Sequence, residues 1–409
     1  APAYRGLCYL VFERLPIGQF GNRIPNISVE LCRVTGELEP AINAITVIPG
    51  ASEFGYDPSP RVRVLGPGAT APENTHLSAR TSDWTLSIDE LCDLCPNLEH
   101  VALVVAWFGD DLRASHCTVA PRVEAASREV SGASWSVAGM ARGTAPVVSY
   151  HEGGPAYGGT PSDGAVLAAI ADLKARGLSV TLYPLLLMDI PHGNPMGQPA
   201  YPWRGRITGD AAGVASFVPG YRDFVVHYAT VAAAGGVEAF VIGSEMRGLS
   251  SVRDGDTFPF VDALVDLAAD VKAVIPGARL TYAADWSEFS GVQSGGGDKM
   301  FHLDPLWASP DIAAVGIDNY MPVGDWRDGS ADADGPHDLG YIAAHIEGGE
   351  GFDWYFASAA DRLDGIRTPI TDGLGEPWIW RFKDMAGWWS HAHHNRPGGV
   401  RDATPTGWV

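Results

Sequence analysis

The chain has 409 residues, of which 46% are hydrophobic and 19% charged, so the sequence predicts a folded protein with a large core rather than a disordered chain. Its 28 Lys and Arg residues against 49 Asp and Glu residues give a formal net charge of -21, which argues against nucleic acids and anionic membranes as general partners. This charge does not repel neutral sugars, and 13 Trp and 13 Tyr residues supply aromatic faces on which sugar rings can stack, although most such rings serve in protein cores.

The first residues lack a basic start followed by an apolar run, so no secretory signal peptide is expected there. The most apolar segment, residues 178–190, is too short to span a bilayer and contains Pro184, so a soluble protein is expected. The odd number of cysteines argues against a disulfide framework. Cys92 and Cys95 have CxxC spacing without a second such pair, which favours buried thiols over a metal or redox site.

Residues 1–35 differ in pattern from the rest of the chain. Residues 7–12 and 27–34 have the pattern of two strands joined by the turn-rich segment LPIGQFGNRIP. Because two strands alone are not a stable unit, this β segment is expected to join a sheet supplied by another domain or chain. Residues 36–98 are rich in Pro, Gly and Asn and are interpreted as a connector.

From residue 99 onward, apolar runs typical of buried strands alternate with segments that have helical periodicity and helix stop signals. The predicted strands are residues 99–108, 145–150, 178–189, 239–245, 279–286 and 312–320, and the predicted helices are residues 160–177, 215–234, 260–277 and 353–363. This alternation indicates a parallel sheet covered by helices, either doubly wound or closed into a barrel. No GxGxxG or GxxxxGK[ST] motif opens a helix, which argues against the usual nucleotide sites of a doubly wound sheet.

Polar and aromatic residues stand where six predicted strands end. They are Trp107, Tyr150, Asp189, Glu245, Asp285 with Trp286, and Asp318 with Tyr320. One such residue could simply begin a solvated loop, but six successive strands favour the site that (β/α)8 barrels build at the carboxyl ends of their strands. We therefore predict an α/β, TIM-barrel-like domain over residues 99–409. Six strands are two fewer than a barrel needs, so the domain is expected to lack its last strands.

Two parts of the sequence resemble phage-derived proteins. The segment YRGLCYLVFERLPIGQFGNRIPNISVEL resembles the baseplate hub regions of phage tail-tip proteins. Nine later segments resemble the TIM-barrel-like domain of the large tail protein of gene transfer agents, phage-derived particles that carry bacterial DNA between cells. They are VVAWFGDDLR, GGTPSDGAV, LKARGLSVTLYPLLLMDIP, YPWRGRITG, VIGSEMRGL, YAADWSE, FHLDPLWASP, VGIDNYMP and HHNRPGGVRDATPTGWV. They cover most of residues 99–409 and are specific as a set.

The gene transfer agent domain in turn looks like retaining glycoside hydrolases, most closely mannanase-like members that carry Gly-Thr-Glu at the fourth strand. Gly243, Ser244 and Glu245 occupy that position here, so the resemblance implies Glu245 as the general acid/base. Retaining hydrolysis needs a second carboxyl group about 5–5.5 Å away. The resemblance implies that this nucleophile follows the seventh strand, in a segment expected just after residue 409, so the 409-residue chain alone is expected to be nearly inactive.

The resemblance also implies a place of action. The protein is expected in the tail baseplate of a virion-like particle, made in the bacterial cytoplasm and acting at the target cell surface within an oligomeric tail assembly. Its expected partners are other tail proteins and a cell-envelope glycan, with no nucleic acid, metal or other cofactor. Because a fold does not certify an activity, two functions stay open: cleavage of the glycan by a retaining mechanism, and a non-catalytic structural or glycan-binding module.

Two further carboxylates are weaker candidates. Glu376, in the segment DGLGEPWIW, is an alternative nucleophile and a candidate substrate contact, although a loop carboxylate that accepts backbone hydrogen bonds is the favoured interpretation. Glu288 follows the fifth predicted strand and is expected on the rim of the site.

Basic residues offer two alternatives as well. His391, His393 and His394 could bind a metal, but surface or stacking histidines are favoured because no carboxylate or Cys stands at helical spacing beside them. Arg204 and Arg206 could reach the carboxylate of an acidic glycan such as peptidoglycan, with structural ion pairs as the alternative.

Overall fold

The structure is a computed structural model, and it describes residues 12, 14–25, 27, 34, 36–48, 50–329, 332–372 and 374–408. The two strands expected at residues 7–12 and 27–34 fall almost entirely outside these residues, and so does their expected pairing. None of the described helices is long and apolar enough to cross a membrane.

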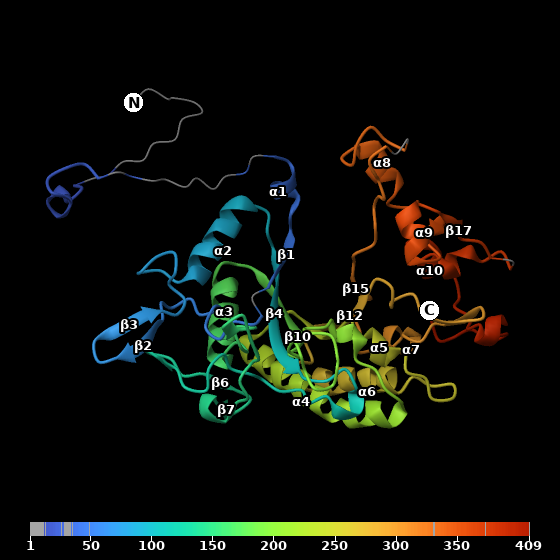
Figure 1. Cartoon of the computed structure of the whole chain (residues 1–409), viewed down its shortest axis with the longest axis horizontal. Helices are drawn as coiled ribbons and strands as arrows, with labels where there is room; N and C mark the ends of the chain where they lie inside the picture. Colours follow the sequence, from blue (N-terminus) through green and yellow to red (C-terminus); the bar gives the residue numbers. More distant parts are fainter. Residues whose placement is uncertain are drawn as a thin grey trace.

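A six-stranded parallel sheet lies at the centre of the molecule (Figure 1). Its strands are β1 (Ala44–Val47), β4 (His100–Gly109), β10 (Ser179–Met188), β11 (Ala239–Ser244), β12 (Arg279–Asp285) and β15 (Gly316–Asp318). They lie side by side in the order in which they occur in the chain, and every neighbouring pair is parallel. This arrangement confirms the predicted α/β, TIM-barrel-like fold.

The sheet is curled into a half-barrel. The hydroxyl of Tyr183 on β10 lies 2.7 Å from Oδ2 of Asp318 on β15, although β11 and β12 separate these strands. In a flat sheet, three strand spacings would put the two backbones about 14 Å apart. Residues along β10 alternate between half-buried positions such as Tyr183 and Leu185, which line a cleft, and fully buried positions such as Leu182. One face of the sheet is therefore concave and open, and the other is covered.

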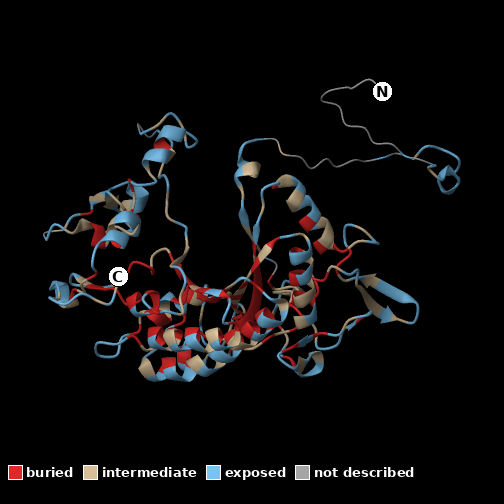
Figure 2. Cartoon of the chain, turned by 180° about the vertical axis from the view of Figure 1, so that it is seen from behind, coloured by how far each residue is buried: buried red, intermediate tan, exposed pale blue. Residues whose placement is uncertain are grey.

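Four longer helices accompany the covered face. They are α2 (Asp83–Leu94), α3 (Asp163–Ala175), α4 (Ala211–Gly235) and α6 (Pro259–Val274). Helix α4 contacts β10 and β11, and α6 contacts α4 and β11. Buried residues concentrate along β4 and on the helix sides that face the sheet, while the β2–β3 hairpin is half-buried or exposed and the α8 region is largely exposed (Figure 2).

Capping and spacing in the sequence explain why α4 forms here. The Asp210 side chain accepts a hydrogen bond of 2.8 Å from the Gly213 N–H at the start of α4, and Gly236 ends the helix in the left-handed conformation with φ 64°. Phe217, Phe224 and other apolar residues between these ends are fully buried against the sheet. The helix is thus fixed by both its ends and its apolar face.

Two sequence predictions are corrected here. Residues 145–150 were predicted as a strand of the sheet, but they form a loop whose end, β8 (Tyr150–His151), pairs antiparallel with β9 (Gly154–Pro155). Residues 36–98, interpreted as a connector, supply β1 at the edge of the sheet and α2, whose Trp84 donates a hydrogen bond of 2.8 Å to Asp172 of α3. Because one strand is added and one removed, β11 is still the fourth strand of the sheet.

The remaining elements are short. The antiparallel strands are β2 (Val62–Gly66), β3 (Ala69–Pro72), β5 (Glu129–Val130), β6 (Ser136–Val137), β7 (Met140–Ala141), β13 (Val292–Gly295), β14 (Asp298–Met300), β16 (Trp354–Tyr355) and β17 (Thr368–Pro369). The short helices are η1 (Ile17–Phe20), α1 (Leu38–Ala41), η2 (Ala114–His116), η3 (Arg142–Thr144), η4 (Arg204–Arg206), α5 (Arg247–Ser250), α7 (Asp304–Trp307), α8 (Leu339–Ala344), α9 (Ala359–Asp364), η5 (Pro377–Trp380), α10 (Met385–Ser390) and η6 (Pro397–Gly399). The helix predicted at residues 353–363 is reduced to α9.

Candidate functional site

A cleft of about 760 Å³ opens on the concave face of the half-barrel. It lies at the carboxyl ends of β11, β12 and β15, where a TIM-barrel-like fold places its site. The cleft brings together five of the residues predicted from the sequence: Glu245, Asp285, Trp286, Asp318 and Tyr320. Aromatic side chains and carboxylates from three strand ends therefore share one opening.

Glu245 follows β11 directly and is buried, with 7% of its surface exposed. Its backbone has φ 52°, in the left-handed region that costs a residue with a side chain about 1–2 kcal/mol. The Glu245 N–H nevertheless keeps a hydrogen bond of 2.8 Å to the Ala283 carbonyl of β12. A buried carboxylate held in a strained backbone conformation is the kind of feature that concentrates at functional sites.

Both polar contacts of the Glu245 carboxylate are made by one of its oxygens. Trp203 Nε1 donates a hydrogen bond of 2.5 Å to Oε2, and Arg204 Nη2 lies 2.9 Å from the same atom. Within the described part of the chain, no side chain or backbone group forms a hydrogen bond with Oε1. The carboxyl group is therefore fixed by one oxygen, and the other remains able to contact a ligand in the cleft.

The surroundings shift the proton affinity of this carboxyl group. Burial raises the pKa of Glu245, the positive charge of Arg204 and the Trp203 hydrogen bond oppose the rise, and the charges of Asp318 and Asp285 add to it. The net shift is upward. A carboxyl group with a raised pKa holds its proton closer to neutral pH, which is the property that a general acid requires.

A hydrogen-bonded chain connects the ends of the strands beneath the cleft. Ser244 Oγ accepts a hydrogen bond of 2.6 Å from Arg204 Nη2 and donates one of 2.8 Å to Asp318 Oδ2. Asp318 Oδ2 also accepts a hydrogen bond from the hydroxyl of Tyr183. Arg204 thus joins two carboxylates, Glu245 directly and Asp318 through Ser244.

The loop that carries Trp203 and Arg204 is held close to α5. A Cβ atom on Gly248 would stand 2.3 Å from the Ile207 carbonyl oxygen and 2.8 Å from that of Gly205. Only glycine at position 248 allows this approach, which places the loop over Glu245. Arg204 was a candidate from the sequence and Trp203 was not, although its aromatic neighbourhood in YPWRGRITG is a signal for such a residue.

Two of the predicted site residues lie on the opposite side of the strands or in a loop. Trp107 on β4 points to the covered face and packs against Phe224 and Tyr228 of α4, with ring centroids 5.3 and 6.4 Å apart. Its register differs by an odd number of residues from Val104, which lines the cleft, so the side chain points to the other face. Tyr150 lies in the β8–β9 hairpin and is 57% exposed, because residues 145–150 do not join the sheet.

Asp189 and Glu376 have structural partners elsewhere. Asp189 is buried, lies 2.9 Å from Arg122 Nη1 and accepts two hydrogen bonds from Ser149. Because Arg122 and Ser149 belong to the long segment that follows β4, Asp189 anchors this segment and does not line the cleft. The Glu376 carboxylate lies 2.5 Å from Arg396 and 3.0 Å from Arg401, which lower its pKa against the opposing effect of burial. These ion pairs give Glu376 a structural role in place of the predicted contact with substrate.

Glu288 is also corrected, since it is buried rather than on the rim. Its carboxyl group accepts hydrogen bonds from Ser250 Oγ at 2.5 Å, Tyr282 OH at 3.0 Å and the Asp285 N–H at 3.0 Å. Burial raises the pKa of Glu288 to about 7. The group therefore supports the loop that follows β12 from below.

The basic residues have separate places. His393 is buried and lies 2.9 Å from Asp304 and 2.7 Å from the Trp388 carbonyl oxygen, so it joins α7 to the C-terminal segment. Arg206 is exposed, in contrast to Arg204. The described residues contain no group of three His, Cys, Asp or Glu side chains that could hold a metal ion.

Solved mannanase structures have limited similarity to this chain. A GH113 β-1,4-mannanase complex is 20% identical with a TM-score of 0.34, a second GH113 β-1,4-mannanase is 18% identical with a TM-score of 0.34, and the β-mannanase AaManA from Alicyclobacillus acidocaldarius in complex with ManMIm is 17% identical with a TM-score of 0.34. Each match covers 56% of this chain and 54% of the mannanase, so the chain spans about half of each enzyme. No curated protein sequence matches the chain. Residues 219–409, which include the Glu245 strand and half of the residues that line the cleft, match the family model described as the GTA TIM-barrel-like domain.

Proposed function

We propose that the cleft binds a cell-envelope glycan and that Glu245 protonates the glycosidic oxygen when the glycan is cleaved. The carboxyl group of Glu245 carries this proposal: it is buried, has a raised pKa, and is fixed through Oε2 while Oε1 has no protein partner among the described residues. This is the arrangement of a group that must hold a proton, aim it and release it.

The other residues of the cleft have roles that follow from their chemistry. As the bond between the anomeric carbon and the glycosidic oxygen breaks, the Glu245 proton passes to that oxygen, and Arg204 stabilises the carboxylate left behind. The anomeric carbon bonds in turn to a nucleophile, a second carboxylate whose ester water then hydrolyses in the retaining mechanism. Asp285 and Asp318 place negative charge opposite the oxocarbenium-like transition state of glycoside cleavage. Trp286 and the exposed Tyr320 offer faces on which sugar rings can stack.

The proposed setting is the tail baseplate of a gene transfer agent or a related phage-like particle, in contact with other tail proteins. The match of residues 219–409 to the GTA TIM-barrel-like domain and the sequence resemblance of the N-terminal segment support this setting. There the cleft would act on the surface glycan of the target cell. A net charge of -21 is compatible with a neutral or locally recognised glycan and unfavourable for nucleic acid.

One observation favours a second function, glycan binding without cleavage. Arg204 lies 2.9 Å from Glu245 and stabilises its ionised form, which opposes protonation of the acid. If the working pH lies well above the pKa of Glu245, the carboxyl group is ionised, and the cleft would bind a sugar but not transfer a proton to it.

The test compares purified variants on a panel of bacterial envelope glycans, with released reducing ends as the measure of cleavage and tryptophan fluorescence as the measure of binding. We expect Glu245→Gln to reduce cleavage by about 10²- to 10⁴-fold without loss of binding. Glu152→Gln is the matched control, because Glu152 also has a left-handed backbone, with φ 51°, but is exposed and outside the cleft. Binding without cleavage by the complete protein, nucleophile included, would establish the second function, and equal cleavage by Glu245→Gln would exclude Glu245 as the acid.

A further inference from the structure

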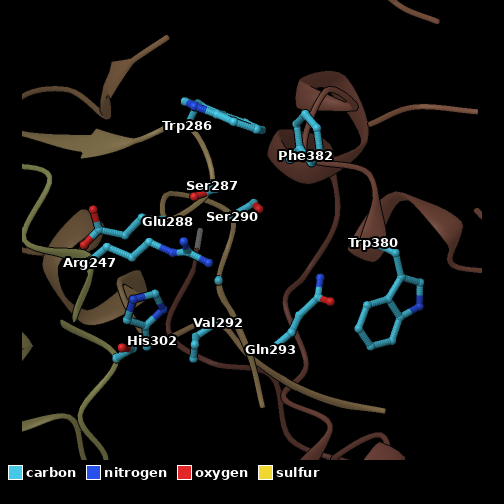
Figure 3. Close-up of a pocket in the computed structure, with 12 residues that line it drawn as sticks. Arg247, Trp286, Ser287, Glu288, Ser290, Val292, Gln293, His302, Trp380 and Phe382 are labelled. Carbon is cyan, nitrogen blue, oxygen red and sulfur yellow. The ribbon is translucent and has the colours of Figure 1, made fainter. Parts of the chain in front are cut away.

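A second pocket, of about 330 Å³, adjoins the cleft. The two cavities share Arg247, Trp286 and Ser287, so a chain of sugars could pass from one into the other. The far side of the second pocket is formed by Gln293 of β13 and by Phe382, which follows η5 (Figure 3). A segment distant in sequence therefore completes a second chamber beside Glu245.

Arg247 is the positive charge of this pocket. Its guanidinium extends from α5 toward the middle of the pocket (Figure 3), and the side chain forms no ion pair with any carboxylate of the described residues. The other arginine of the cleft, Arg204, is ion-paired with Glu245 at 2.9 Å. In a chain with 49 acidic and 28 basic residues, an arginine at a cavity without an acidic partner is a candidate for binding an acidic ligand.

Two other titratable side chains, Glu288 and His302, line the pocket, and neither forms an ion pair with Arg247. Glu288 directs its hydrogen bonds to Ser250, Tyr282 and the Asp285 N–H, and burial raises its pKa to about 7. Burial lowers the pKa of His302 to about 3, so its imidazole is neutral at neutral pH. Among the described residues that line the pocket, Arg247 is the only Arg or Lys.

The other walls suit a sugar ring. Trp286 and Phe382 lie edge to face above Arg247, with ring centroids 4.7 Å apart, and Trp286 is half-buried (Figure 3). The Gln293 amide and the Ser290 hydroxyl add polar groups around the guanidinium. Aromatic faces together with a few convergent polar groups are typical of small-molecule sites.

We propose that the second pocket is a subsite for a carboxylated sugar and that Arg247 binds the carboxylate. The guanidinium can donate two parallel hydrogen bonds to a carboxylate, which gives both affinity and orientation. The carboxylate belongs to a uronic acid or to the lactyl ether of a muramic acid, since both carry the same group on a pyranose ring. This inference rests on the proposed function and deepens it, because it makes the glycan acidic and places its acidic residue beside the sugar that contacts Glu245.

Calorimetric titrations of the Glu245→Gln chain test the subsite separately from catalysis. The probes are oligogalacturonate, its methyl ester, an oligosaccharide of alternating N-acetylglucosamine and N-acetylmuramic acid, and the neutral chitohexaose. We expect at least one of the two acidic probes to bind about tenfold or more tightly than its neutral counterpart, and the acidic probe that binds identifies the source of the carboxylate.

Arg247→Gln should weaken the binding of the acidic probe by about 10- to 100-fold and leave the affinity for neutral probes unchanged. Arg247→Lys keeps the charge but loses the two parallel donors, so its affinity for the acidic probe should fall between that of the Arg247 chain and that of Arg247→Gln. Arg279→Gln is the matched control, because Arg279 is an exposed arginine at the opposite end of β12 from the cleft.

The outcomes separate the inference from the proposed function. Equal binding of acid and ester, no binding of either acidic probe, or equal losses in Arg247→Gln and Arg279→Gln would overturn the carboxylate subsite. Cleavage of a neutral glycan that depends on Glu245 would in that case still support the proposed function. The comparison of oligogalacturonate with its methyl ester uses a chain that keeps Arg247. This comparison therefore tests the subsite even if the Arg247→Gln variant folds poorly.

Discussion

The Tyr183 hydroxyl lies 2.7 Å from Asp318 Oδ2 and thereby connects the third and sixth strands of the sheet across its concave face. Ser244 on the fourth strand donates a second hydrogen bond, of 2.8 Å, to the same oxygen. These contacts show that the curl of the sheet is stabilised by polar side chains on its open face as well as by the helices on its covered face. The same side chains form the floor of the cleft, so curvature and site share one network.

Tyr183→Phe should therefore destabilise the fold. The substitution keeps the ring and removes the donor to the Asp318 carboxylate, a hydrogen bond worth about 1.5–3 kcal/mol of unfolding free energy. Urea unfolding followed by fluorescence measures the change. Tyr150→Phe serves as the control, because that tyrosine is 57% exposed and its loss should cost less than about 0.5 kcal/mol. Equal losses in both variants would show that the Tyr183 contact does not stabilise the curl.

Arg204→Gln should move the pH dependence of cleavage. Burial raises the pKa of Glu245 and Arg204 opposes this rise, so removal of the positive charge must raise the pKa further. A general acid works only when protonated, and activity is lost as pH rises through its pKa. The basic limb of the kcat/KM profile should therefore move to higher pH. Arg206→Gln, at an exposed arginine two residues away, should leave the limb in place. A shift to lower pH would contradict the role assigned to Glu245.

Glu288→Gln should change how stability depends on pH. Burial raises the pKa of Glu288 from 4.5 to about 7, so between these values the folded chain binds a proton that the unfolded chain releases. This contribution to stability is complete below about pH 4.5 and is lost as pH rises through about 7. The slope is at most about 1.4 kcal/mol per pH unit and should be absent from Glu288→Gln.

The difference between the two chains is the quantity to measure in this experiment. Buried His302, whose pKa burial lowers to about 3, contributes the opposite slope in both chains and cancels in the difference. Urea unfolding at intervals from pH 4.5 to 7 gives the two curves. Parallel curves over this range would mean that folding does not raise the pKa of Glu288.

The sequence was sufficient to predict the class of fold and the central residue of the site. Apolar runs at β4, β10, β11 and β12 are long enough to indicate the strands of a largely buried parallel sheet, although the structure leaves the concave face of that sheet open. Glu245 stands immediately after such a run, and burial of an unpaired carboxylate costs free energy, so a buried carboxylate there indicates either an ion pair or a functional role. That local rule was enough to single the residue out before its contacts were known.

The tertiary structure decided which residues share the cleft. Strand β1 has only four residues, so its short apolar run does not identify it, and its pairing with β4 is a long-range choice. Trp107 and Asp285 both end predicted strands, but the direction of each side chain depends on register, and one residue of offset sends it to the opposite face. Trp203 and Arg204 reach Glu245 from about forty residues away only because Gly248 lets their loop approach α5. Periodicity is encoded locally, whereas the partners of a side chain depend on segments that meet only when the sheet curls.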